Sequence, residues 1–155
     1  MRALWMLAVV LSSAPVFAEE PCRIDAGPRD VVKKSGDVVI EAGQVVEDAV
    51  ALDGKVTVKA GATVLNAVSF HGDVVVEDGA TVQKSALSIG GVVRVAKGAT
   101  VKSTIEVSGK GVRVHGEDGG DVDVNLVING KSLGQRIADE VLSGLKSCRV
   151  VAVKE

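Results

Sequence analysis

Residues 40–107 determine the fold, and they read IEAGQVVEDAVALDGKVTVKAGATVLNAVSFHGDVVVEDGATVQKSALSIGGVVRVAKGATVKSTIEV. One apolar residue recurs at every sixth position, with one extra residue between Val82 and Ile89. The members of this series are Ile40, Val46, Leu52, Val58, Val64, Phe70, Val76, Val82, Ile89, Val95, Val101 and Val107. A second small or apolar residue lies two positions before nearly every member, so each pair places two side chains on one face of a short strand.

A longer period is superimposed on the hexads. Gly43, Gly61, Gly79 and Gly98 follow one another at intervals of 18, 18 and 19 residues, and the last three begin the phrase GATV. Because 18 residues are three hexads, we expect each coil to have three sides and the coils to stack in parallel. The predicted fold is all-β: a single-stranded triangular parallel β-helix of about four coils. An ordinary sandwich would place its turns every 8–12 residues instead.

Outward residues repeat with the same period and should form columns along the faces of the coils. These columns supply the candidate partner-facing residues, which are Val39 and Val75 on one face and Thr63, Thr81 and Thr100 on another. On the third face Asp53 and His71 fall on neighbouring rungs, where they could form an oriented base or bind a cation, or could simply be solvated.

The amino terminus resembles a secretory signal peptide. Arg2 precedes an apolar run, and small residues lead to Val16-Phe17-Ala18, so cleavage between Ala18 and Glu19 is expected. The apolar run is too short for a transmembrane helix. We therefore expect a periplasmic or secreted protein that does not span the membrane.

Charge and composition argue against nucleic acid as a partner. The chain carries 18 basic and 20 acidic residues, and loss of Arg2 with the leader leaves a net charge of about −3. No basic block is present, and aromatic residues make up 2% of the chain. Nucleic-acid binding usually depends on a basic stripe and stacking rings.

Two cysteines, Cys22 and Cys148, lie near opposite ends of the expected mature chain. In an oxidising compartment, a single pair of cysteines predicts one disulfide. No metal site is expected from two isolated cysteines, and no cofactor is expected.

The repeat breaks down after Gly109. One more half-coil is expected at Val112 and Val114, followed by an alternating strand over 122–128 and an amphipathic helix with the apolar stripe Leu133, Ile137, Val141 and Leu145. The expected organisation is a signal peptide (1–18), an amino-terminal strap (19–35), the solenoid (36–120) and a strand–helix–strand cap (121–155). The alternative is that the helix binds a partner.

Carboxylates among glycines provide a second candidate site for a cation. His115 is followed by Glu117, Asp118 and Asp121 in a glycine-rich segment, and such oxygen ligands suit Ca²⁺. The spacing differs from that of an EF-hand.

The runs VKAGAT (58–63) and VEDGAT (76–81) resemble the hexapeptide repeats of left-handed β-helix proteins, which include acyltransferases and gamma-class carbonic anhydrases. The 18-residue coil also resembles that of the bactofilins, which are polymer-forming bacterial scaffolds. Both resemblances cover 36 to about 115. A zinc carbonic anhydrase would use three histidines, and this chain has two.

These observations predict a non-enzymatic structural protein of the bacterial cell envelope. It would present flat solenoid faces for self-association or for binding an envelope protein. A glycan- or cation-binding module and a hexapeptide-type acyltransferase remain alternatives.

Overall fold

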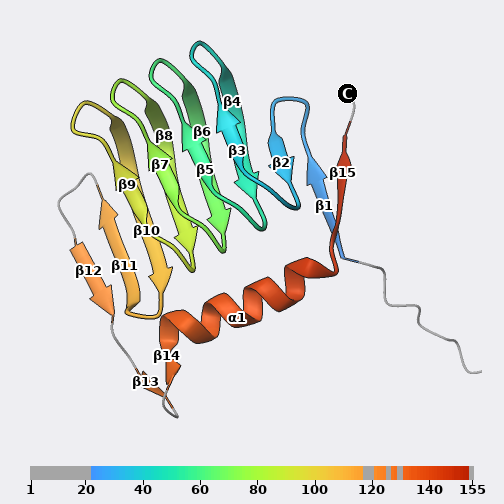
Figure 1. Ribbon diagram of the computed structural model, residues 1–155, viewed down its shortest axis with the longest axis vertical. Helices are drawn as coiled ribbons and strands as arrows, with labels where there is room; N and C mark the ends of the chain where they lie inside the picture. Colours follow the sequence, from blue (N-terminus) through green and yellow to red (C-terminus); the bar gives the residue numbers. More distant parts are fainter. Residues whose placement is uncertain (1–21, 117–120, 125–126, 129–130, 154–155) are drawn as a thin grey trace, which may run out of the picture.

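The computed structural model describes residues 22–116, 121–124, 127–128 and 131–153. Four coils stack side by side, and each consists of one short and one long strand (Figure 1). The short strands form a four-stranded parallel sheet in the order β3 (Val38–Ile40), β5 (Val56–Val58), β7 (Val74–Val76) and β9 (Val93–Val95). The long strands pair in parallel in the order β4 (Val45–Ala51), β6 (Thr63–Phe70), β8 (Thr81–Ile89) and β10 (Thr100–Ser108). The predicted β-solenoid is therefore confirmed.

Further strands extend the sheet of long strands at both ends. β2 (Val31–Lys33) pairs in parallel with β4 and adds a partial rung before the first coil. At the other end β11 (Gly111–Gly116) and β12 (Asp121–Val124) pair antiparallel. The prediction of another half-coil at Val112 and Val114 is wrong, because the chain reverses between β10 and β11 instead of continuing the parallel stack.

Each long strand includes two of the three predicted sides of its coil. The pairing register shifts where the two sides meet, between Val64 and Asn66 of β6. Here β8 has two residues, Gln83 and Lys84, between Val82 and Ser85, whereas β6 has only Leu65 between the paired residues. The extra residue that interrupts the hexad series is thus accommodated as a bulge at this bend.

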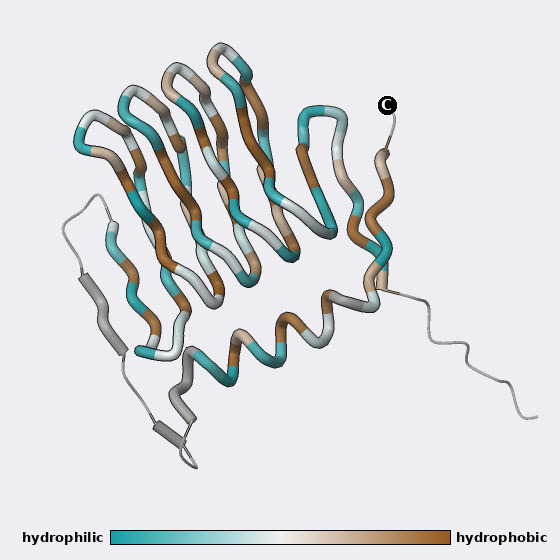
Figure 2. The backbone as a smooth tube through the Cα atoms, in the orientation of Figure 1, coloured by the Kyte–Doolittle hydropathy of each residue, from teal (hydrophilic) through white to brown (hydrophobic). Residues whose placement is uncertain are grey.

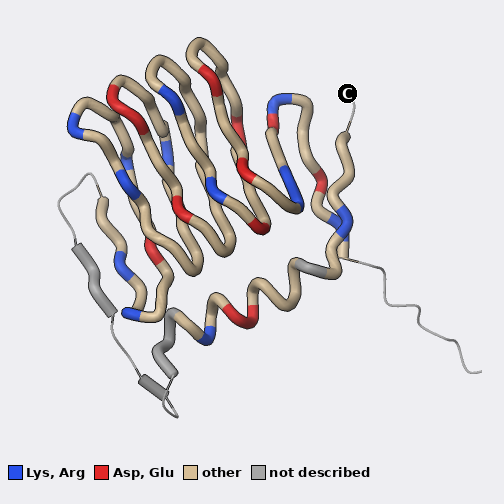
Figure 3. The backbone as a smooth tube through the Cα atoms, in the orientation of Figure 1, with Lys and Arg blue, Asp and Glu red and all other residues tan. Residues whose placement is uncertain are grey.

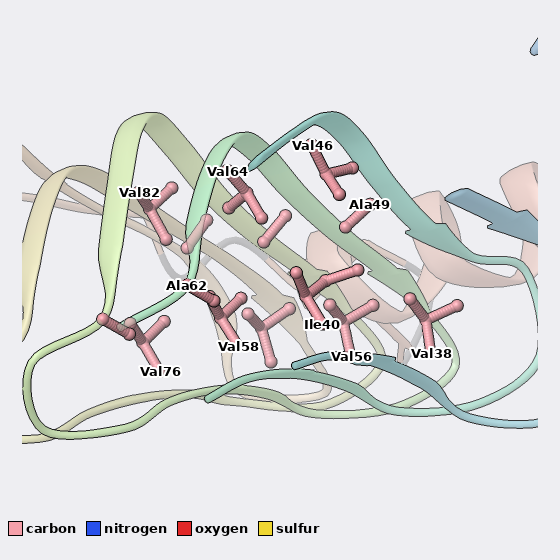
Figure 4. Close-up of a cluster of buried hydrophobic side chains, with 14 of the residues drawn as sticks. Val38, Ile40, Val46, Ala49, Val56, Val58, Ala62, Val64, Val76 and Val82 are labelled. Atoms are coloured by element: carbon pink, nitrogen blue, oxygen red, sulfur yellow. The ribbon is translucent and has the colours of Figure 1, made fainter. Parts of the chain in front are cut away.

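The space between the two sheets is filled by aliphatic side chains from facing strands (Figure 4). Val38, Ile40, Val56, Val58, Val64, Val74 and Val82 are completely buried, and Val76 is 1% exposed. Val101 packs against the same core from the last coil. These residues occupy the inward positions that the hexads predict for the first two sides of each coil.

On the third side the hexad residues point the other way. Ala67 and Ser69 are completely buried within the solenoid, whereas their larger neighbour Phe70 packs in a second cluster outside the sheet. The same cluster contains Leu87, Ile89, Ile105, Val107 and Val112. The expectation that all hexad residues share one interior is therefore wrong for this side, because small residues occupy the inward positions there.

Serine hydroxyls and glycines join successive coils at the corner that follows this side. The Ser69 hydroxyl donates to the Gly54 carbonyl oxygen at 2.7 Å, and the Ser88 hydroxyl donates to that of Gly72 at 2.8 Å. A Cβ atom placed on Gly72 would lie 2.4 Å from the Gly54 oxygen. Glycine is therefore required at this corner because the backbones approach so closely.

The GATV phrase marks a different corner. The Ala62 amide donates to the Lys59 carbonyl at 2.9 Å, and Gly61 lies between them with φ of 78°. A positive φ at the third position of such a turn favours glycine. The coil before and the coil after contain the same turn, with Gly43 at 81° and Gly79 at 80°.

Helix α1 (Leu133–Lys146) covers the second cluster and returns the chain to its starting end. It runs beneath the carboxyl-terminal ends of the long strands, and its apolar positions recur along its length (Figures 1 and 2). Ile137, Ala138 and Val141 pack on the cluster, as the predicted stripe requires. The side chain of Leu133 lies outside the described residues. The helix therefore lies along the flank of the coils and does not simply close the last coil.

A disulfide and a parallel strand pair fix the two ends of the chain together. β15 (Arg149–Ala152) pairs with β1 (Arg23–Ala26), and Cys148 is bonded to Cys22 with their Cα atoms 4.4 Å apart. The predicted disulfide is confirmed. Two short strands, β13 (Val127–Ile128) and β14 (Lys131–Ser132), precede the helix.

Within the described ranges, no helix is both long and apolar enough to cross a membrane.

Candidate functional site

The outer columns have the register that the sequence predicts. Val39 lies beside Thr57, Thr57 beside Val75 and Val75 beside Arg94 on the sheet of short strands. On the sheet of long strands, Val45 lies beside Thr63, followed by Thr81 and Thr100. Acidic and basic segments are interspersed along the coils (Figure 3). These faces therefore combine small β-branched residues with charges of both signs.

Exposed aliphatic side chains are concentrated on the first and last coils. In the first coil Val45 is 69% exposed and Val39 is 40% exposed. In the last coil Val92 is 38% exposed and Val95 is 40% exposed. The equivalents of Val45 in the other coils are threonines, so the apolar outer surface is greatest toward the two ends of the stack.

Val95 occupies an inward position that no following strand of its sheet covers. Its equivalents in the preceding coils, Ile40, Val58 and Val76, are at most 1% exposed. β9 is the last strand of its sheet, whereas the sheet of long strands continues beyond β10. The solenoid therefore ends on the β9 side in an exposed apolar surface that includes Val95. We call this surface the apolar step at β9.

The backbone of β9 presents an open edge at this step. Val92 and Ala96 are bonded to β7, and alternate residues direct their N–H groups to the opposite side. The Val93 amide is met there by the Glu106 carboxylate at 2.7 Å, and Glu106 also accepts from Arg113 at 3.2 Å. The Val95 amide lies farther along the same edge.

Asp53 and His71 are brought together, as the sequence suggests. His71 Nδ1 lies 3.3 Å from Asp53 Oδ1, and both side chains are 62% exposed. His71 has φ of 70°, the one left-handed non-glycine residue in the described part of the chain, and the next coil has Gly90 with φ of 86° at this corner. This conformation is unfavourable for a residue with a Cβ atom, so a histidine at this position calls for an explanation.

The same pair lines a cavity between the solenoid and the helix. The cavity has a volume of about 360 Å³, and its walls are Lys34, Ser35, Leu52, Asp53, His71, Leu142 and Leu145. Leu142 and Leu145 come from the last turns of α1, and Leu52 comes from the first coil. The inner wall is therefore apolar, and the polar groups come from the corners of the coils.

The second predicted cation site, which comprises His115, Glu117, Asp118 and Asp121, lies only partly within the described residues. His115 of β11 lies opposite Asp121 of β12 in the antiparallel register. Glu117 and Asp118 lie outside the described residues. Among the residues whose side chains are described, no three His, Cys, Asp or Glu groups gather as metal ligands would.

Of the described residues that line the cavity, the sequence predicts Asp53 and His71 as site residues and misses five, which are Lys34, Ser35, Leu52, Leu142 and Leu145. The helix pattern predicts Leu145 in the apolar stripe that covers the end of the solenoid, whereas the structure places this residue at the cavity. The available signal was the second apolar position beside the stripe, Leu142, which widens the apolar face of the helix beyond what one packed cluster needs.

Comparisons with protein-family models, with curated proteins and with solved structures found no match to this chain.

Proposed function

We propose that this chain is an exported structural protein of the bacterial cell envelope that self-associates through the terminal coils of its solenoid, leaving its flat faces available to an envelope partner. The observation that carries the proposal is the apolar step at β9. There Val95 is 40% exposed, although its equivalents are buried. A solenoid is stabilised by contacts between neighbouring coils, so an end without a cover is a surface on which another strand can be added.

The exposed valines of the first coil support the same proposal. Val39 and Val45 would extend the contact at the opposite end, where β3 is the last strand of its sheet. Contacts between two different ends generate open chains of subunits, and contacts between like ends generate pairs. Both outcomes fit a scaffold built by stacking.

Export is supported by the disulfide between Cys22 and Cys148. Such bonds persist mainly in oxidising compartments outside the cytoplasm. Together with the amino-terminal apolar run and the Val16-Phe17-Ala18 sequence that follows it, the disulfide favours a location in the periplasm or outside the cell.

The proposal is tested by light scattering on purified residues 19–155 with the disulfide intact. Val95→Asp should shift the assembly toward single chains, since a charge would be buried at the contact. Thr81→Lys, on the outer face of a middle coil, serves as the control and should leave the mass distribution unchanged. Equal masses for wild type and Val95→Asp at every concentration would exclude the β9 end as the contact.

A further inference from the structure

The cavity beneath the last turns of α1 is a second feature that packing alone does not explain. Along its first turns the helix is packed closely against the second cluster through Ile137, Ala138 and Val141. Along its last turns it leaves about 360 Å³ between Leu142, Leu145 and Leu52. Unfilled apolar space costs stability because its lining loses dispersion contacts. A volume of this size with apolar walls and a few polar groups is typical of small-molecule sites.

The polar groups at this site indicate the charge of the ligand. Lys34 lines the cavity, and no acidic side chain lies within ion-pair distance of it in the described part of the chain. Asp53, the one acid among the described residues of the lining, already faces His71 at 3.3 Å. Ser35 adds a hydroxyl donor. An anionic group would therefore gain an ammonium partner and a hydroxyl donor without displacing an existing ion pair.

The backbone at His71 is a separate indication. A left-handed backbone is unfavourable for a residue other than glycine, and the neighbouring coil avoids this strain with Gly90 at φ of 86°. Strain of this kind is found at binding sites, where a side chain is needed in a fixed direction. The left-handed conformation of His71 places its imidazole at the cavity, where a glycine would contribute no side chain.

We propose that this cavity binds an amphiphile with a single aliphatic chain and one anionic head group. The chain would lie against Leu52, Leu142 and Leu145, and the head group would pair with Lys34 and accept a hydrogen bond from Ser35, beside the His71 imidazole. None of the residues that line this cavity belongs to β3 or β9, the strands proposed for self-association, so the site does not depend on it.

The disulfide holds the helical wall of the site in place. Cys148 follows Leu145 by three residues, and its amide donates to the Leu145 carbonyl at 3.0 Å. Cys148 is bonded to Cys22 beside the first strand. The leucine wall is therefore anchored to the amino-terminal end of the chain, and opening the disulfide should loosen the site.

The test uses three probes with the same decyl chain: decanoate, decanol and decyltrimethylammonium. Calorimetric titration of oxidised residues 19–155 should give the tightest binding for decanoate and the weakest for the cation. Decyl phosphate is a fourth probe, and its affinity relative to decanoate distinguishes a phosphorylated lipid from a free fatty acid as the natural source. Absence of binding by every decyl anion would overturn the proposal, and so would equal affinity for all three head-group charges.

Variants locate the site. Lys34→Glu should weaken decanoate binding by about tenfold or more, since it replaces the partner of the anion with a like charge. Lys102→Glu makes the same change in net charge on an exposed residue outside the cavity lining and should leave the affinity unchanged. Equal losses from both substitutions would show a general charge effect and would refute the assignment of Lys34.

Two further variants keep the test independent of folding. His71→Gly removes the left-handed strain, so its melting temperature should be maintained or raised while decanoate affinity falls. Leu142→Phe should fill the cavity and abolish binding without lowering the melting temperature. Retained binding in the filled variant would place the ligand elsewhere.

Discussion

Breaking the disulfide should destabilise the whole chain, because Cys22 and Cys148 enclose nearly all of the described residues. The two cysteines are 126 positions apart. Cross-linking a loop of 126 residues removes chain entropy from the unfolded state, which corresponds to about 5 kcal/mol at 25 °C. This contribution is a large share of the free energy of unfolding of a typical domain, which is about 5–15 kcal/mol.

The double variant Cys22→Ala with Cys148→Ala removes the disulfide. We expect a loss of about 3–5 kcal/mol in the free energy of unfolding, since measured values often fall below the entropic figure. Denaturant unfolding of oxidised wild type and of the variant, followed by far-ultraviolet circular dichroism, measures the difference. Each single variant should lose about as much as the double variant, because either substitution breaks the same bond.

A loss below about 1 kcal/mol would show that the disulfide contributes little to the stability of the fold. It would mean that pairing of β1 with β15 holds the ends together even without the bond. Single-variant losses that add up to the double-variant loss would show that the cysteines act through separate contacts.

Three further predictions test the register, the second cluster and export. Val76→Asp should unfold the chain, since it buries a charge between the sheets, whereas Thr81→Lys should lower the free energy of unfolding by less than about 0.5 kcal/mol. Thermal melts of the two variants measure this difference, and greater damage from Thr81→Lys would show that the register is wrong. Ile89→Ala should cost about 2–4 kcal/mol in denaturant unfolding although the side chain points out of the coil, because α1 covers it; a cost near zero would mean that the helix is not docked. Mature protein should begin at Glu19, and amino-terminal sequencing of exported material that finds Met1 would contradict cleavage.

The hexad pattern predicts the fold because two sides of each coil obey it without ambiguity. At Val56–Val58 and Val74–Val76 large residues alternate with outward ones, and the inward positions are fully or almost fully buried. The parallel register of the outer columns follows from the same 18-residue period. Local sequence and global fold agree here, so the pattern was sufficient.

The third side was misassigned because both of its faces are covered. Ala67 and Ser69 point inward while Val68 and Phe70 point outward, and all four are at least partly buried. A strand covered on both faces lacks a clear polar face. The hexad pattern predicts that the larger residues point inward, whereas the completely buried inward positions of this side are Ala67 and Ser69. The apolar stripe of the helix needs an apolar surface to pack on. That requirement is the signal in the sequence that favours outward apolar residues on the third side.

The cavity could not be predicted from local pattern. Lys34, Leu52 and Leu145 come from three distant parts of the chain, and only the path of α1 along the coils brings them together. The pairing of Asp53 with His71 was accessible because the two residues are one coil apart. Residues related by the repeat are therefore predictable, and residues brought together by the returning helix are not.

Amide exchange at Val95 is the most direct test of assembly through the terminal coils, because this N–H lies on the open edge of the last coil. Exchange is measured residue by residue by nuclear magnetic resonance on oxidised residues 19–155 at low and high protein concentration. If the chain assembles through its terminal coils, protection of the Val95 amide should rise with concentration, while that of the Val75 amide in the coil before it should not change. A Val95 amide that exchanges at the same rate at every concentration, in a sample whose mass still grows, would contradict assembly through this end.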